Sequence, residues 1–398
     1  MSKYLGYALA GGAVVYGYKY FADRSKVLSP DQQIVIVGGG YGGIRVAKNL
    51  KGRGNFTLID PKGSMHHNMA ALRAAVESGF ANKTFIPYKP IFGEHFVQGR
   101  VTSIDTDNKN VTIDSRMAPI PYTQLVIATG TTGPFPGKCR HDLSTKQLQD
   151  LYENLATEVK SASNIVIVGG GAVGVEMAGE IVGDYPGTKK VTVVHNSDVL
   201  ISPKLSQKAQ DKIKDKLDEK KIERVLGEKV TNLGNLPVNK TSEGLEVELS
   251  SGKKLDADLV IPCFGSSNIT DAYATSPSLS KSMNQKGQLK VNEYLQVEGV
   301  NDVFAIGDAN DFDVVKLALE AQAQGSHTYE NLINIGKGKP LTPYKPDAFM
   351  MAIPIGRDGG VCVRGNSVMG DFMAKMIKGK DVFVKIMWKE MEQPVPKN

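Results

Sequence analysis

Two glycine fingerprints constrain the fold of this chain more than any other feature. Each follows an apolar, β-branched run, at 34–37 and at 165–168, and each opens a helix-like stretch. The glycines are Gly38, Gly40 and Gly43 in the first copy and Gly169, Gly171 and Gly174 in the second. In such a motif the first glycine makes a tight turn, the second admits a pyrophosphate to the backbone, and the third lets helix and strand pack closely. The helix N-terminus then faces the negative charge. Two copies predict two dinucleotide sites on two Rossmann-like domains, hence an α/β fold.

The size of the chain allows this organisation. At 398 residues it exceeds what one hydrophobic core usually serves, so two or three domains are expected. The net charge of +6 is mild; it is compatible with an anionic membrane or anionic cofactors and does not demand nucleic acid. Three cysteines lie far apart, without the spacing of a disulfide framework or a zinc site, which favours a reducing compartment. No metal site is expected.

The N-terminus reads differently from the rest. Residues 4–18 are uncharged and rich in Ala, Gly, Val and Tyr, with basic residues after them. Fifteen residues is shorter than the roughly 20 that a membrane-spanning helix needs. A membrane-inserted helix is the preferred interpretation; a cleaved targeting peptide and a buried helix stay open. The basic flank would leave the folded body on the cytoplasmic side.

The two fingerprint units end their second strands differently. Asp60 follows the strand at 56–59, 22 residues after Gly38, where a carboxylate receives the ribose hydroxyls of an adenine dinucleotide. The strand at 191–194 ends in His195 instead. A histidine does not repel a 2′-phosphate, so NADH and NADPH are both expected at the second site.

The order of motifs resembles the two-dinucleotide-binding flavoprotein reductases. An Ala-Thr-Gly turn at 128–130 follows the first unit, Cys-Phe-Gly at 263–265 echoes it after the second, and Ala-Ile-Gly-Asp follows at 305–308. The resemblance implies that Thr129, Gly130 and Asp308 contact FAD and that Gly265 belongs to the cofactor-binding set. It implies an FAD-binding domain at 29–146 and 268–338 and an inserted NAD(P)H-binding domain at 147–267. The apolar N-terminal segment, at 1–28, is a separate anchor, and a C-terminal α+β segment follows at 339–398.

A closer resemblance is to the ferroptosis-suppressor protein family, also called mitochondrion-associated apoptosis-inducing-factor homologues. It is carried by the runs 66–68 and 70–73, and by 79–81, 132–137, 175–178 and 295–299. That family implies an FAD-dependent NAD(P)H:quinone oxidoreductase at membranes, acting on ubiquinone or vitamin K type quinones, with antioxidant quinols as products. Arg73 joins the cofactor-binding set on this basis. No cysteine lies in 64–76, where disulfide reductases of this fold carry a redox pair, so the flavin is expected to reduce a diffusible acceptor directly.

One departure from the family concerns the membrane. Its members carry a myristoylated glycine after the initiator Met, and here Ser2 takes that position. The apolar N-terminal segment is expected to replace that anchor. A basic amphipathic stretch at 369–388 suits a membrane interface, or caps the flavin domain; both readings stay open. The mitochondrial outer membrane, a lipid droplet or another cytoplasmic-face membrane is the expected location, and homodimerisation stays open.

Three side chains are candidates for chemistry beyond cofactor binding. His66 and His67 are expected near the flavin edge, where either could donate a proton for quinol formation or simply pack. Glu176, two residues after Gly174, holds the nicotinamide or its ribose by the resemblance; alternatively it is a carboxylate favoured by the helix dipole.

Two rival functions stay open at this stage. One is a type II NADH dehydrogenase of a respiratory chain, which shares the fold and the reaction. The other is a nucleic-acid-binding death effector of the apoptosis-inducing-factor kind. The second would need a clustered basic patch, whereas the positive charge here is interspersed with acids.

Overall fold

The computed structural model describes residues 8–10, 13–15 and 27–397 of the chain. At the N-terminus, β1 (Ala8–Ala10) pairs antiparallel with β2 (Ala13–Val15). These parts are strands, not the expected helix. The β-branched Val14 and Val15 favour a strand over a helix here. The rest of the apolar segment lies outside the described residues. Within the described part of the chain, no helix has the length and apolarity to cross a membrane.

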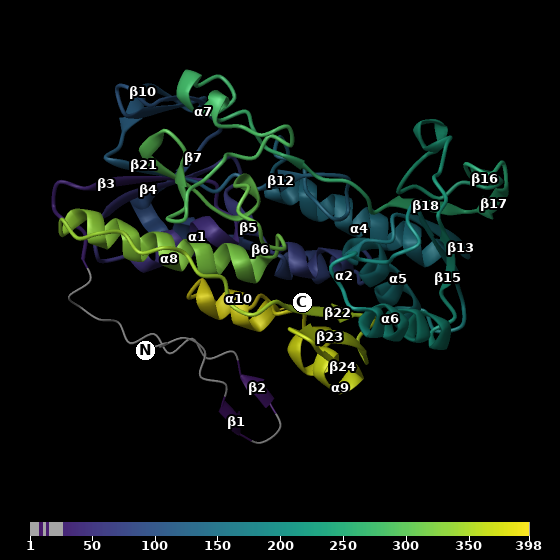
Figure 1. Ribbon diagram of the computed structural model, residues 1–398. Helices are drawn as coiled ribbons and strands as arrows, with labels where there is room; N and C mark the ends of the chain where they lie inside the picture. Colours follow the sequence, from purple (N-terminus) through teal and green to yellow (C-terminus); the bar gives the residue numbers. More distant parts are fainter. Residues whose placement is uncertain (1–7, 11–12, 16–26, 398) are drawn as a thin grey trace.

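The first Rossmann-like domain is built on a six-stranded sheet in the order β20-β21-β11-β3-β4-β7. Its strands are β3 (Gln33–Val37), β4 (Asn55–Asp60), β7 (Phe96–Gln98), β11 (Gln124–Ile127), β20 (Gln296–Val297) and β21 (Val300–Ala305). All neighbours run parallel except β20 against β21. The helices α1 (Tyr41–Leu50) and α8 (Ala318–Gly336) lie side by side over the sheet (Figure 1). Because both sheet faces are covered, β3 reads as a continuous apolar run.

The second domain repeats this plan between β11 and β21. A four-stranded parallel sheet has the order β15-β14-β13-β18. Its elements are α4 (Thr145–Ser161), β13 (Asn164–Val168), α5 (Ala172–Asp184), β14 (Lys190–His195), α6 (Gln207–Glu219), β15 (Glu223–Leu226) and β18 (Leu259–Pro262), with a hairpin of β16 (Leu245–Glu248) and β17 (Lys254–Ala257). The expected α/β fold, one Rossmann-like domain inserted in another, is confirmed.

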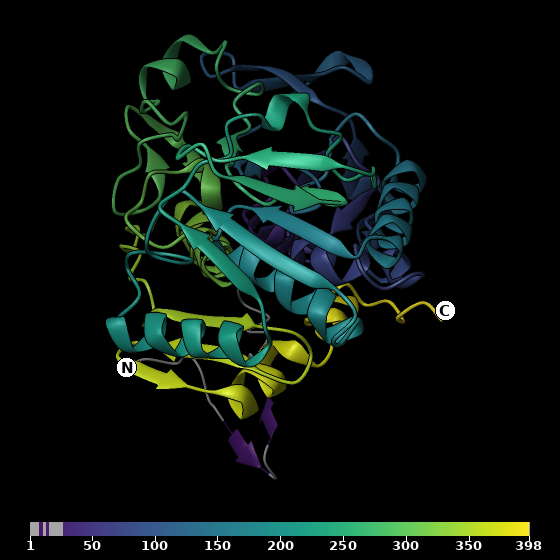
Figure 2. The same ribbon diagram turned by 90° about the vertical axis from the view of Figure 1, so that its right-hand side faces the viewer.

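A C-terminal unit follows α8. An antiparallel sheet of β22 (Met350–Pro354), β23 (Gly360–Arg364) and β24 (Ser367–Met369) leads into α9 (Asp371–Ala374), a π-helical turn at Lys375–Gly379 and α10 (Val384–Glu390). This unit lies against both domains (Figure 1), and α6 runs beside its sheet (Figure 2). Trp388 Nε1 donates to the Lys83 carbonyl at 2.8 Å, and Lys216 Nζ donates to Asp371 at 2.7 Å.

Shorter elements complete the chain. The strands are β5 (Ser64–His66), β6 (Phe85–Pro87), β8 (Val101–Asp105), β9 (Asn110–Ile113), β10 (Arg116–Pro121), β12 (Thr131–Thr132) and β19 (Ser267–Asn268). The helices are α2 (Ala71–Ala74), α3 (Lys89–Phe92) and α7 (Pro277–Lys281), with 3-10 turns at Asn68–Ala70, Phe80–Lys83, Gly93–His95, Leu233–Asn235 and Gly307–Ala309. β12 pairs with β19 where the chain passes between the two domains.

Candidate functional site

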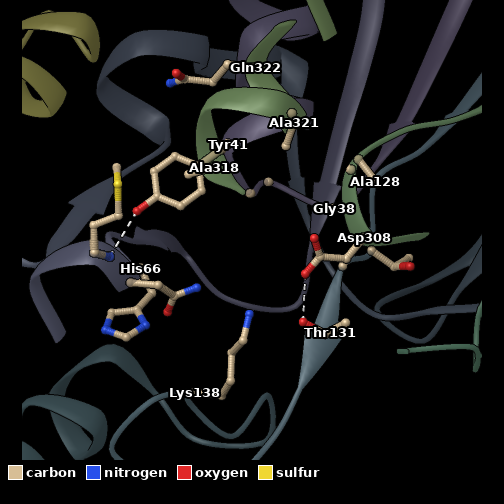
Figure 3. A pocket seen from close by; sticks show the side chains of 18 of the residues that line it. Gly38, Tyr41, His66, Ala128, Thr131, Lys138, Asp308, Ala318, Ala321 and Gln322 are labelled. Atoms are coloured by element: carbon tan, nitrogen blue, oxygen red, sulfur yellow. Dashed lines mark hydrogen bonds between the residues drawn. The ribbon is translucent and has the colours of Figure 1, made fainter. Parts of the chain in front are cut away.

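A cavity of about 520 Å³ lies where the first domain, the second domain and the C-terminal unit meet. Its walls come from the first glycine turn, the Ala128–Gly130 turn, Gly307–Asp308, the start of α5 and the segment around Lys378. Figure 3 shows Tyr41, His66, Lys138 and Asp308 around this space. The cavity therefore gathers residues that lie up to hundreds of positions apart in the sequence.

The first fingerprint is shaped for a close approach of phosphate. Gly38 has φ +106°, and a Cβ there would lie 2.4 Å from the Ala128 carbonyl oxygen. A Cβ at Gly43 would lie 1.9 Å from the Gly38 carbonyl oxygen, so only glycine lets α1 start this close to β3. Gly40 lines the cavity, and a Cβ there would meet nothing within 4 Å. The backbone at Gly40 is thus open to a ligand, as the motif predicts.

Asp60 is buried at the end of β4, beside this turn. Its Oδ2 accepts from the Gly39 amide at 2.7 Å, and its Oδ1 accepts from the Lys62 amide at 2.9 Å. The Lys62 ammonium lies 3.6 Å away. Tyr88 supports the turn from below by donating to the Gly39 carbonyl at 2.7 Å. The Asp60 carboxylate lines the cavity, where it can accept from ribose hydroxyls.

Asp308 lies opposite, on the 3-10 turn after β21. Its Oδ2 accepts from Thr131 Oγ1 at 2.9 Å (Figure 3). Thr129 and Gly130 also line the cavity; the Thr129 hydroxyl donates to the Ile269 carbonyl at 3.0 Å, and Gly130 has φ +70°. The three residues that the resemblance assigned to one site are therefore brought together.

Lys138 is a cavity residue that the sequence reasoning missed. Its side chain extends into the space between His66 and Asp308 (Figure 3). Burial lowers the pKa of its ammonium, and the nearby Asp308 carboxylate opposes that shift. The lysine follows the Pro- and Gly-rich stretch at 133–137, whose composition indicates only a loop.

The two candidate histidines have different surroundings. His66 lines the cavity and stacks on Phe85, with ring centroids 4.6 Å apart. Burial holds the pKa of His66 well below its ordinary value, and the Lys62 charge adds to this. Its Nε2 lies 3.7 Å from Cys139 Sγ, and its Nδ1 has no hydrogen-bond partner among the described residues. His66 is thus a buried, neutral ring in the cavity wall.

His67 lies behind the cavity wall. Met69 N donates to Tyr41 Oη at 3.2 Å, and Tyr41 Oη lies 2.9 Å from His67 Nδ1. His67 Nε2 lies 2.7 Å from the Val382 carbonyl, which can only accept. This order fixes the tautomer, with the proton on Nε2, so both ring nitrogens are engaged. Burial lowers the pKa of His67 to about 4. His67 joins the first domain to the C-terminal unit and, within the described structure, does not line the cavity.

Glu176 and Lys378 form an ion pair in the cavity wall. Lys378 Nζ donates to both carboxylate oxygens at 2.7 Å. Burial raises the pKa of the Glu176 carboxyl, and the Lys378 charge opposes that shift. Glu176 was identified from the sequence, whereas Lys378 was one of several lysines in the stretch at 369–388 without a distinguishing signal.

Arg73 is fully buried behind this pair. Its guanidinium donates twice to Glu180, at 2.8 Å each, and it donates to the carbonyls of Gly379 and Lys380 at 2.8 and 3.1 Å. Arg73 is not among the described residues that line the cavity. The structure therefore does not place Arg73 at the cofactor site to which the resemblance assigned it.

The second fingerprint reproduces the geometry of the first. Gly169 has φ +116°, and a Cβ at Gly174 would lie 1.8 Å from the Gly169 carbonyl oxygen. Gly171 is open, with nothing within 4 Å of a Cβ, and Gly265 has φ +64° at the carboxyl end of the neighbouring strand. His195 ends β14 beside this turn. Burial lowers the pKa of His195, so its ring carries no charge that would attract or repel the 2′-phosphate of NADPH.

Only one of the three thiols reaches the cavity. Cys139 is buried there beside His66 and Tyr152, and burial raises its pKa to about 11. All three cysteines are free. Neither of the other two thiols lines the cavity beside Cys139.

The residues present fit an adenine dinucleotide at the first turn. Gly40 leaves open space at the N-terminus of α1, and the buried carboxylate of Asp60 lies at the end of β4. Asp60 would hold the ribose, the backbone around Gly40 the pyrophosphate, and Asp308 with Lys138 the chain that leads to the reactive ring.

The sequence of this chain is similar to those of known proteins. The family model described as pyridine nucleotide-disulphide oxidoreductase matches residues 32–325. Ferroptosis suppressor protein 1 of Xenopus tropicalis is 40% identical over 367 residues, which cover 92% of this chain and 97% of that protein. The human protein of the same name is 40% identical over 364 residues, or 91% and 96%. Apoptosis-inducing factor homolog B of Dictyostelium discoideum is 31% identical over 393 residues, or 92% and 99%.

Solved structures share the fold at lower identity. The sulfide:quinone oxidoreductase of Aquifex aeolicus superposes with a TM-score of 0.71 at 19% identity and covers 92% of this chain and 93% of that one. NDH2 of Plasmodium falciparum superposes with a TM-score of 0.65 at 15% identity, covering 92% and 100%.

Proposed function

This chain belongs to the pyridine nucleotide-disulphide oxidoreductase family and to the ferroptosis suppressor proteins among its members, and from that premise we propose a quinone as its electron acceptor. The protein is an oxidoreductase that uses FAD and NAD(P)H. In the proposed reaction, NAD(P)H loses a hydride, and the quinone gains two electrons and two protons to become a quinol. The second proton comes from solvent. The quinol then traps lipid radicals.

The apolar end of the cavity is the observation that carries the quinone proposal. Beyond the first turn, the walls change from glycine backbone and carboxylates to large apolar side chains. They are Leu317, Leu319, Met350, Met351, Ile377, Phe383, Ile386 and Met387. A hydrophobic ring with a tail fits such a surface, whereas a dithiol relay to a disulfide substrate would need a second thiol beside Cys139.

The residues of the first domain would bind and orient the resident cofactor. Bound FAD supplies the redox chemistry by taking up and releasing two electrons. Asp60 accepts from ribose hydroxyls, the amides at the start of α1 face the pyrophosphate, and Asp308 and Lys138 fix the far end of the cofactor. This fixed orientation brings the reacting atoms together, which is the protein's main contribution to the rate.

The second fingerprint and Glu176 would bind the reductant. Gly171 leaves room for the pyrophosphate of NAD(P)H, and Glu176 lies on the first turns of α5 in the cavity wall. We propose that Glu176 accepts from the nicotinamide ribose or amide. Since His195 has no negative charge, both NADH and NADPH are accepted.

His66 would line the acceptor site without serving as a proton reservoir. Its depressed pKa keeps the ring neutral at pH 7. Protons would then reach the quinol from water through the cavity.

Membrane association would bring the hydrophobic acceptor to this cavity. Phe372 and Ile386 of the C-terminal unit are 65% and 44% exposed, and Ile386 also lines the cavity. Exposed lysines surround them: Lys375, Lys380, Lys385 and Lys389. We propose that this surface lies on an anionic, cytoplasm-facing membrane such as that of mitochondria or lipid droplets, together with the N-terminal segment.

A panel of acceptors tests the proposal. The purified chain should be yellow and should oxidise NADH and NADPH with short-chain ubiquinone and menadione. Disulfides should not be reduced. A chain that carries no flavin, or that retards DNA at physiological salt while leaving quinones unreduced, would contradict the proposal and favour the death-effector alternative.

A further inference from the structure

Two buried side chains of the first domain hold one segment of the cavity wall from behind. We call Ile377–Phe383 the wall segment, because Ile377, Lys378 and Phe383 line the cavity. Arg73 donates to the carbonyls of Gly379 and Lys380, and His67 donates to the carbonyl of Val382. Three backbone carbonyls between residues 379 and 382 are thus held by side chains that do not line the cavity.

The wall segment has a conformation that needs such support. The segment begins within the π-helical turn at Lys375–Gly379, a geometry that occurs often at functional sites. Val382 and Phe383 have φ of +46° and +63°, which a β-branched or bulky residue adopts only under constraint. Without the donors from Arg73 and His67, the segment would relax, and its side chains would leave the cavity wall.

Helix α5 connects this support to the cavity. Glu176 and Glu180 are four residues apart on α5 and so share one face. Glu180 pairs with Arg73 behind the wall, and Glu176 pairs with Lys378 within it. Arg73 binds Glu180, which lies one turn from Glu176 on α5, and it also binds the carbonyl of Gly379, which follows Lys378. Arg73 therefore fixes the position of Lys378 relative to Glu176.

We propose that Arg73 and His67 are positioning residues that hold the wall segment, and with it Lys378, against Glu176. They therefore act on NAD(P)H binding and flavin reduction without contacting either nucleotide. The inference rests on the proposed role of Glu176 at the nicotinamide. It reassigns both residues, which the sequence placed in cofactor binding and catalysis.

The test uses variants that remove the support with little harm to folding. Arg73→Met alone would leave Glu180 buried and unpaired, so the main variant is Arg73→Met with Glu180→Met. Arg73→Lys keeps the charge and loses the paired geometry. His67→Leu removes both hydrogen bonds, whereas His67→Gln can keep them. Arg357→Met is the control, since Arg357 also joins the C-terminal unit to Glu77 and Asp184 at 2.8 and 2.6 Å but gives no bond to residues 379–382.

The readout is flavin content and anaerobic flavin reduction by NADH, with no quinone present. The double variant and His67→Leu should retain FAD and raise the NADH concentration at half-maximal reduction rate about tenfold. Arg73→Lys should fall between them and wild type; His67→Gln and Arg357→Met should resemble wild type. In a Lys378→Met background, removing Arg73 and Glu180 should add little, because the two changes act through one contact.

Three outcomes would overturn the inference. These are loss of FAD with normal NADH kinetics in the loaded fraction, additive effects in the Lys378→Met background, and variants indistinguishable from wild type. If the double variant does not fold, Arg73→Lys and His67→Leu decide by the same readout. Failure of wild-type flavin to accept electrons from NADH would instead sink the proposed function, which keeps the two failures distinguishable.

Discussion

Lys378 Nζ lies 2.7 Å from both carboxylate oxygens of Glu176, a residue 202 positions earlier in the chain. The pair joins the second domain to the C-terminal unit inside the cavity wall. The carboxylate that we propose as the nicotinamide ligand is thereby held in one place, while it shares its lone pairs with an ammonium.

Replacing Glu176 by Gln should impair use of NAD(P)H selectively. The amide keeps the shape but loses the charge that orients Lys378, so KM for NADH should rise about tenfold with FAD content unchanged. Steady-state kinetics with saturating quinone measures this. Glu219→Gln on the exposed face of α6 is the matched control, and loss of flavin from Glu176→Gln would assign the residue to the other cofactor.

Two glycines of the first fingerprint should differ in role, Gly43 in the stability of the fold and Gly40 in the binding of FAD. Gly43→Ala places a Cβ 1.9 Å from a backbone oxygen and should destabilise the protein by about 3 kcal/mol or more. Gly40→Ala meets open space in the free protein, at a φ of −76° that alanine accepts, so it should fold normally and bind FAD poorly. Thermal unfolding and flavin absorbance distinguish them. Equal stability of the two variants would contradict the geometry.

A carboxylate at the end of β14 should change nucleotide choice. His195→Asp would repel the 2′-phosphate of NADPH and accept from the ribose of NADH. We expect kcat/KM for NADPH to fall at least about tenfold while that for NADH stays within about twofold. An equal loss with both nucleotides would mean that His195 does not face the ribose.

Acid should destabilise the protein through His67. Its pKa is about 4 when folded and 6.5 in the unfolded chain, so stability is constant above pH 6.5 and is lost as pH falls towards 4. The loss from this residue is about 3 kcal/mol over that range. Denaturant unfolding at several pH values should show a shallower acid slope for His67→Gln, with equal slopes above pH 7. An unchanged acid slope would refute the buried neutral tautomer.

The exposed apolar side chains of the C-terminal unit should contribute to membrane binding. Phe372→Ser should weaken sedimentation with anionic vesicles several-fold, and added salt should weaken it further. Met117→Ser is the control, because Met117 is fully exposed at 100% on β10 of the first domain. Equal binding of both variants would exclude the C-terminal surface.

Local motifs made much of this site predictable. Gly38, Gly40, Gly43, Asp60 and Asp308 lie next to strand ends, where chain geometry alone fixes what they face. Lys378, Lys138 and Cys139 reach the cavity through tertiary packing of a loop and a C-terminal unit, and no local pattern separates them from surface residues of the same type.

The same reason explains why Arg73 and His67 lie elsewhere than expected. Both belong to the runs 66–68 and 70–73 that resemble the ferroptosis-suppressor family, and the residue just before each, His66 and Leu72, lines the cavity. Which side of the wall a residue takes depends on the segment around Lys380, some 300 residues later. Similarly, β1 and β2 pair as strands within an apolar run that we expected to form a helix.

An anaerobic double-mixing experiment tests the central claim most directly. NADH should bleach the flavin absorbance of the purified chain, and a short-chain ubiquinone added next should restore it, with one quinol formed per NADH consumed. Flavin that is reduced by NADH but is not reoxidised by the quinone would contradict the account.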